Sequence, residues 1–129
     1  MLPWQPTNKV PYSLAAADCH IVSLDEGFEG ISIPSKTYTS LAAGAAILAI
    51  SPSGTALQFL VKKHNCGVWI PPRNPQFLGD VIKKLNDDPK ALATMKQNSR
   101  IVAEKFFNKK ACTKKYLDVL LPFLNSNNF

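Results

Sequence analysis

The residues best placed to do chemistry are Pro34, Ser35 and Lys36, which open a short helix predicted over 36–43. Proline and serine are both common at helix starts. A helix N-terminus carries unpaired backbone N–H groups and about half a positive charge, so it can hold an anion such as a phosphate. Lys36 would add a full charge beside those groups. The pattern fits an anion site and an ordinary helix cap equally well.

The other reactive side chains lack the spacing of a catalytic or metal site. Cys19, Cys66 and Cys112 lie far apart in apolar surroundings, which predicts buried, reduced thiols. The two histidines have no ligand spacing, so no metal is expected. Glu26 and Glu29 lie on a glycine-containing stretch that imposes no geometry on them, so solvated loop acids are preferred to an acid–base pair.

Composition is typical of a globular protein. The 129 residues are 46% hydrophobic and 19% charged, and no apolar run approaches the roughly 18–20 residues that cross a bilayer. The first residues have neither the basic nor the apolar region of a secretory signal. A cytoplasmic location is therefore expected, with peripheral attachment at the inner face of the membrane if basic residues bind it.

Most of the net charge of +6 comes from one region. Ten lysines and arginines lie between Lys83 and Lys115, against three acids. A solvated helical face is the first interpretation. The alternative is affinity of the basic C-terminal helices for an anionic surface, either membrane headgroups or a phosphorylated substrate. Aromatic residues do not interleave with these lysines as a base-stacking platform requires, so no nucleic-acid partner is expected.

Periodicity and turn residues predict alternating helices and strands. Strands are expected at 19–23, 46–50 and 67–70, with helices at 10–17, 36–43, 55–64, 75–85, 89–106 and from about 109 onward. This order implies helical crossovers onto a parallel sheet. Three strands are few for such a sheet. The expected class is therefore α/β, a partial doubly wound (Rossmann-like) parallel sheet with flanking helices, whose other strands lie outside this chain.

Ligands of open α/β sheets bind beyond the carboxyl ends of the strands. Three predicted loops, 24–35, 51–54 and 71–74, share that edge. The first is the longest, and it leads directly to Ser35 and Lys36. The topology therefore favours the anion-site interpretation.

Four segments stand out by their motifs, namely 10–18, 30–44, 64–72 and 87–106. In order and spacing they resemble the C-terminal, nucleotide-sugar-binding half of GT-B glycosyltransferases of the retaining family called group 1 or family 4. The second, with its Pro-Ser-Lys start, is similar to a branch that includes bacterial polysaccharide-building members. The resemblance implies a partial GT-B C-terminal domain over 1–123, on the donor side, followed by a frayed tail over 124–129.

The implied function is the donor-binding part of a glycosyltransferase that moves a sugar from a nucleotide-diphosphate sugar to a polysaccharide or glycolipid acceptor. No metal or other cofactor is implied, and no catalytic residue is identified. By resemblance, N–H groups near Ser35 and Lys36 hold the diphosphate, and position 39 faces the ribose. The implied donor-binding residues are Gly30, Ile31, Pro34, Ser35, Lys36 and Thr39, with the first two near the transferred sugar.

The chain also departs from the family pattern. Many members carry two glutamates at the positions of Ile31 and Thr39, so a carboxylate grip on the ribose is not expected, although Thr39 can offer one hydrogen bond. Glu26 looks like the first of these glutamates but lies five residues before its expected position. The preferred interpretation is that Glu26 is not the equivalent residue. Members also have an N-terminal half, so such a half or a partner chain is expected, and the isolated chain should turn over little or no substrate. The alternatives are a non-catalytic interaction or regulatory module derived from a truncated glycosyltransferase, and an unrelated half-Rossmann binding domain.

Overall fold

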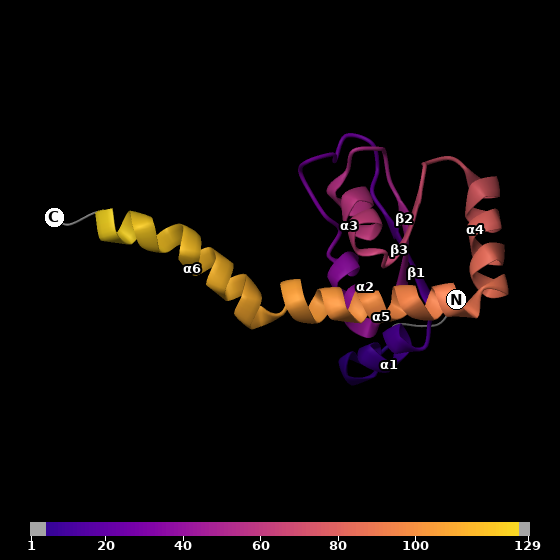
Figure 1. Cartoon of the computed structure of the whole chain (residues 1–129), viewed down its shortest axis with the longest axis horizontal. Coiled ribbons are helices and arrows are strands. Elements are labelled where there is room, and N and C mark those ends of the chain that lie inside the picture. Colours follow the sequence, from indigo (N-terminus) through magenta and orange to yellow (C-terminus); the bar gives the residue numbers. More distant parts are fainter. Residues whose placement is uncertain (1–4, 127–129) are drawn as a thin grey trace.

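The computed structural model describes residues 5–126 and confirms the predicted order of helices and strands (Figure 1). Their bounds differ from those predicted by one or two residues at a few ends. The elements are η1 Thr7–Lys9, α1 Val10–Ala15, β1 Cys19–Ser23, α2 Lys36–Ala43, β2 Ala46–Ile50, α3 Ala56–His64, β3 Gly67–Ile70, α4 Pro75–Asp87, α5 Pro89–Phe106 and α6 Lys109–Ser126.

The three strands form one parallel sheet in the order β1-β2-β3. Cys19 pairs with Ala46 in the first ladder, and Ile47 pairs with Gly67 in the second. The central strand β2 reads Ala-Ile-Leu-Ala-Ile and is buried on both faces, as a covered parallel strand must be. The expected α/β, Rossmann-like class is confirmed.

Helices cover both faces of this sheet. On one face, Leu41 of α2 and Leu57 of α3 pack with Ile47 in a single buried cluster. On the other face, Val81 of α4 packs in a second cluster with Leu48, the next residue of β2. Side chains alternate across a strand, so β2 supplies both layers of the core. This is the doubly wound arrangement in a small form.

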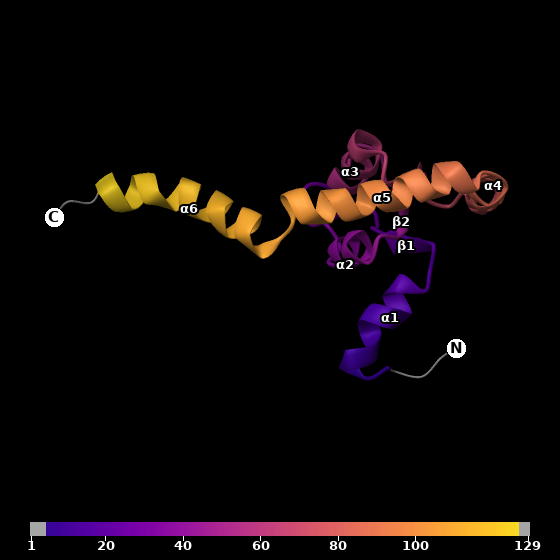
Figure 2. The same cartoon turned by 60° about the horizontal axis from the view of Figure 1, so that its bottom comes forward.

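α5 runs along the amino ends of the strands and ties together the segments that precede them (Figure 2). The Nζ of Lys96 lies 2.6 Å from the Oδ1 of Asp18, just before β1. The guanidinium of Arg100 donates to the carbonyl oxygen of Ala42, at the end of α2, over 2.6 Å. The Ser99 hydroxyl donates to the carbonyl of Cys66, beside β3. Polar side chains of one helix thus hold this edge of the sheet.

β1 is covered on one face only. His20 and Val22 are buried against α2 and its neighbours, whereas Ile21 on the opposite face is 45% exposed. Within residues 5–126, β1 pairs with β2 alone and its other edge has no strand beside it. Such an edge can accept another strand. The expectation that further strands complete the sheet stays a prediction.

α6 continues beyond the end of α5 and extends away from the sheet (Figures 1 and 2). α6 is described through Ser126, and the domain boundary and frayed tail expected at residues 123 and 124 stay a prediction. Residues 127–129, and residues 1–4 at the expected domain start, lie outside the described residues. Among the helices described, none combines the length and apolar character needed to cross a membrane.

Candidate functional site

The start of α2 presents backbone donors, as the sequence predicted. Ser35 occupies the N-cap position, but its side chain makes no capping hydrogen bond. The N–H groups of Thr37 and Tyr38 bond to the carbonyls of Pro34 and Ser35 at 2.9 and 3.1 Å. The preceding N–H groups, of Ser35 and Lys36, have no partner among residues 5–126. Unpaired donors at a helix N-terminus can receive an anion.

Lys36 adds a cation at the same place. Its side chain is exposed, and it forms no ion pair within the described part of the chain. A free ammonium group and two free N–H groups therefore lie on consecutive residues. Pro34, half-buried, precedes them and restricts the chain where it enters the helix.

Thr37 was missed by the sequence analysis. Its side chain is completely buried, and its hydroxyl has no hydrogen-bond partner in the described structure. A buried hydroxyl without a partner is unfavourable, and such groups are uncommon in proteins. The available signal was the spacing of Thr37, Ser40 and Leu41 at i, i+3 and i+4, which marks the buried face of α2.

Gly30 and Ile31 lie on the loop that leads into α2. Gly30 has a φ of +75°, and the N–H of Ile31 donates to the carbonyl of Phe28 over 3.2 Å, which closes a turn. The turn exposes two apolar side chains, Phe28 at 51% and Ile31 at 77%. The loop tip is thus apolar and open, while its last residues are polar and cationic.

Thr39 lies one turn further along α2. Its hydroxyl donates to the carbonyl oxygen of Lys36 over 3.0 Å, a bond within the helix. The residue also lines a hollow between α2 and α1, together with Leu14 and Arg100. Five of the six predicted residues thus lie on the loop before α2 or at its start, whereas Thr39 lines the hollow beside α1.

The first and third loops of the carboxyl edge are joined by an ion pair. Nη2 of Arg73, after β3, lies 3.7 Å from Oε2 of Glu26, after β1. Both side chains are mostly exposed, so this pair adds little stability. Arg73 has a φ of +57°, which is uncommon for a residue with a side chain. Glu26 was expected to be a solvated loop acid and Arg73 was not singled out, although it is the cation of the third loop.

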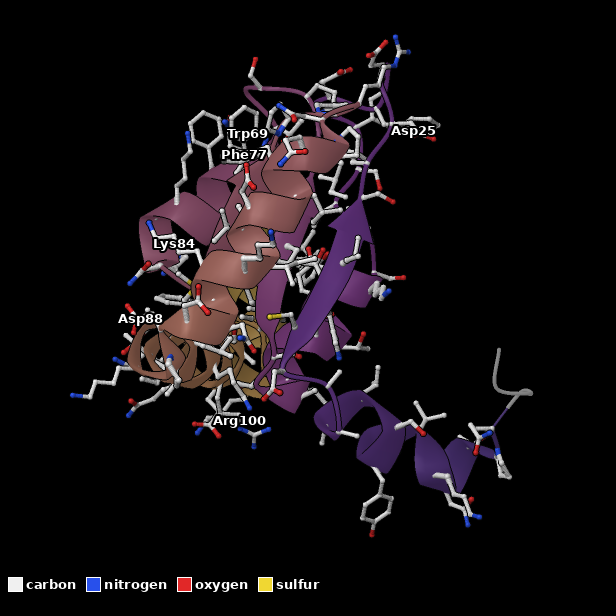
Figure 3. All side chains as sticks on the ribbon, turned by 90° about the vertical axis from the view of Figure 1, so that its right-hand side faces the viewer. Asp25, Trp69, Phe77, Lys84, Asp88 and Arg100 are labelled. Carbon is white, nitrogen blue, oxygen red and sulfur yellow. The ribbon has the colours of Figure 1, made fainter. Side chains whose placement is uncertain are left out.

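The second loop is held by buried polar contacts. The hydroxyls of Ser51 and Thr55 lie 2.8 Å apart, and Thr55 caps α3 by accepting from the N–H of Gln58. The indole N–H of Trp69 on β3 donates to the carbonyl of Ser51 over 2.9 Å. Figure 3 shows Trp69 and Asp25 at the same end of the molecule, opposite Asp88 and Arg100. The carboxyl edge thus combines one well-held loop with two more exposed ones.

The cysteines are free, as expected, but only one is fully buried. Burial raises the pKa of the Cys66 thiol to about 11, so it stays protonated at neutral pH. The expectation of burial was wrong for Cys19 and Cys112, which are half-buried. Cys19 lies on the poorly covered face of β1, and Cys112 lies on α6, away from the core. Among residues 5–126, no three histidine, cysteine or acidic side chains gather as metal ligands would.

The fold is an α/β sheet of the Rossmann-like class, with a cationic helix start at the carboxyl edge of its strands. Over 80 residues, the chain is 34% identical to the probable glycosyltransferase WbjE of Pseudomonas aeruginosa. The matched region is 62% of this chain and 20% of that protein, so the similarity spans about a fifth of the relative's length. No family model matches the chain, and no solved structure matches it.

Proposed function

We propose that the chain is the donor-binding part of a glycosyltransferase. The observation that carries the proposal is the 34% identity to a probable glycosyltransferase. The start of α2 supports it, because unpaired N–H groups and Lys36 suit the diphosphate of a nucleotide sugar. The sugar would pass to a polysaccharide or glycolipid acceptor.

In this proposal the diphosphate lies against the N–H groups of Ser35 and Lys36, with the Lys36 ammonium beside it. Protein positive charge and the helix dipole then balance the leaving nucleotide, the role a metal ion has in other transferases. The exposed loop tip with Gly30 and Ile31 would lie near the sugar. Thr39 would accept one hydrogen bond from a ribose hydroxyl, because its own proton is donated to the Lys36 carbonyl.

The finer assignment, to the C-terminal half of a retaining GT-B enzyme, rests on the ordered motifs and on the doubly wound sheet. In that assignment the transferred sugar lies between two halves, so an N-terminal half or a partner chain completes the enzyme. The uncovered edge of β1 is where further strands would pair. The isolated chain would then bind the donor but turn it over little or not at all.

One observation favours a second candidate, a non-catalytic module that keeps the fold. Ile31 and Thr39 stand at positions where many family members have glutamates, and the Thr39 hydroxyl is already bonded within its helix. Such a module would have lost the carboxylate grip on the ribose, and its affinity for nucleotide sugars would be weak or absent.

Calorimetric titration of the chain separates the two candidates. UDP, GDP and ADP, each with and without a sugar, are compared with the matching nucleoside monophosphates. At least one diphosphate should bind about tenfold more tightly than its monophosphate, the order of one charge-assisted contact. If no diphosphate binds better than its monophosphate, the donor site is wrong and the module interpretation replaces it.

A further inference from the structure

α6 exposes an unusual amount of apolar surface. Tyr116 is 72% exposed, Phe123 69% and Leu124 68%, and none of them contributes to either core cluster. The helix extends away from the sheet in both views, so the rest of the described chain does not cover it (Figures 1 and 2). A helix with this much exposed apolar surface needs another surface against which to bury it.

Four apolar residues of α6 form a stripe, Leu117, Leu121 and Leu124 widen the apolar surface on one side of it, and polar residues lie on the other side. Tyr116, Val119, Leu120 and Phe123 recur at i, i+3, i+4 and i+7, the spacing of one helix face. Successive residues lie about 100° apart around a helix, so Asp118 points away from this stripe. It is the single acid of 109–126. The stripe is therefore free of negative charge.

Four lysines lie in the first two turns of α6, namely Lys109, Lys110, Lys114 and Lys115. None forms an ion pair within residues 5–126. Lys115 lies on one side of Tyr116, with its Nζ 6.0 Å from the centre of the Phe106 ring, and Lys110 lies on the other side. Long lysine side chains can lie along apolar surface and keep the ammonium in a polar layer.

The apolar surface continues from α6 onto the body of the protein. At the junction of α5 and α6, a hollow is lined by aromatic residues of three helices, with Tyr38 from α2, Phe107 after α5 and Tyr116 from α6. The ring centres of Tyr38 and Phe107 lie 5.0 Å apart. Whatever covers the α6 stripe therefore also reaches the side of the domain, close to the start of α2.

We propose that α6 binds the surface of an anionic lipid bilayer and lies in its interface, with Tyr116, Val119, Leu120 and Phe123 in the acyl layer and the lysines at the headgroups. The charge pattern favours this occupant over a second copy of the chain. A second copy would bring another set of uncompensated lysines and no acids to pair with them, whereas anionic headgroups neutralise them. A polar flank with an apolar stripe suits a helix that lies on a membrane and does not cross it.

The test is sedimentation of the whole chain with lipid vesicles. The chain should partition into vesicles of equal phosphatidylglycerol and phosphatidylcholine at least about tenfold better than into phosphatidylcholine alone, because a lysine near an anionic surface strengthens binding about fivefold. The triple change Lys109→Gln, Lys110→Gln and Lys115→Gln should lower partitioning about 100-fold. Phe123→Asp should also lower it strongly. α6 lies outside the core clusters, so the urea midpoint of each variant should stay unchanged.

Lys83, Lys84 and Lys90 provide the matched control, since all three are exposed, lie on α4 and α5, and form no ion pair among the described residues. Changing these three to glutamine alters the net charge equally and should reduce partitioning less than about fivefold. Equal losses in the two triple variants would overturn the proposal, because binding would follow net charge alone. Equal binding to neutral vesicles, or no vesicle binding with self-association through Phe123 in light scattering, would also overturn it.

Discussion

A buried hydrogen bond joins His20 of β1 to Ser40 of α2, with 2.8 Å between the imidazole Nδ1 and the hydroxyl oxygen. The other ring nitrogen, Nε2, lies 3.0 Å from the carbonyl oxygen of Leu14 on α1. A carbonyl can only accept, so Nε2 carries a proton, and in the neutral imidazole Nδ1 then accepts from the Ser40 hydroxyl. One side chain of β1 therefore fixes two helices.

Removing either partner should destabilise the protein. Ser40→Ala leaves Nδ1 of His20 without a donor and should lower the free energy of unfolding by about 1–2 kcal/mol. His20→Ala also removes buried volume and should cost about 3 kcal/mol. Urea denaturation measures both. Ser13→Ala is the matched control, because its hydroxyl bond to Lys9 is exposed. Equal effects of Ser40→Ala and Ser13→Ala would contradict the buried bond.

Lys36→Ala should weaken binding of the preferred nucleotide diphosphate about tenfold, because one charge-assisted contact is lost. Lys36→Arg keeps the charge and should retain most of the affinity. Lys63→Ala, an exposed lysine in the last turn of α3, is the control and should leave affinity unchanged. Calorimetry gives all three constants. Affinity that falls equally for Lys63→Ala would indicate a general effect of net charge.

Thr37→Val should leave stability unchanged or raise it by about 1 kcal/mol. The two side chains have the same shape, and the substitution replaces a buried hydroxyl that lacks a partner by a methyl group. Ser99→Ala is the contrasting variant. The buried Ser99 hydroxyl donates to the Cys66 carbonyl, so its removal should lower the free energy of unfolding. A marked loss of stability in Thr37→Val would mean that this hydroxyl has a partner.

Gly67→Ala should be among the most damaging single changes in the sheet. A Cβ at this position would lie 2.0 Å from the carbonyl oxygen of Ile47, so β2 and β3 would have to separate. We expect a loss of at least about 3 kcal/mol. Gly79→Ala in α4 meets no atom within 4 Å and should stabilise the helix by about 0.5–1 kcal/mol. Thermal unfolding of the pair gives the comparison, and similar melting temperatures would refute the close approach.

Stability should fall in alkaline solution through Cys66. The folded state raises the pKa of this thiol to about 11, above its ordinary value of 9.0, because burial disfavours the thiolate. The folded protein thus holds the proton more tightly than the unfolded chain does. The contribution is complete below pH 9 and is lost as the pH rises to 11. Unfolding free energies measured over this range should decline less steeply in Cys66→Ala, and an unchanged slope would exclude this thiol as the cause.

The sequence predicted the sheet well, because its signals are local. Short apolar runs ended by Pro52 or Pro71 mark strands, and Gly44, with a φ of +70°, ends α2 where expected. The polar contacts were not predictable in the same way. His20 contacts Leu14 and Ser40, and Arg73 contacts Glu26, only in the folded chain. The spacing of these residues along the sequence therefore does not predict the contacts.

The start of α2 was predictable for the same reason, because a helix start is a local feature. The role of Ser35 and Lys36 in binding a ligand stays a prediction. The direction in which Thr39 points depends on where α1 packs, and that is a tertiary property.

The two ends of the sheet should differ in how well they tolerate substitutions, because the hydrogen bonds from α5 are made at one end. At the amino end, Lys96, Ser99 and Arg100 are each committed to a backbone or side-chain partner, so substitutions there disturb the scaffold. At the carboxyl end, the side chains of the first and third loops make fewer such contacts, and the ion pair between Glu26 and Arg73 is exposed. Evolution could therefore alter these loops to suit a new ligand while the anchored end preserved the fold.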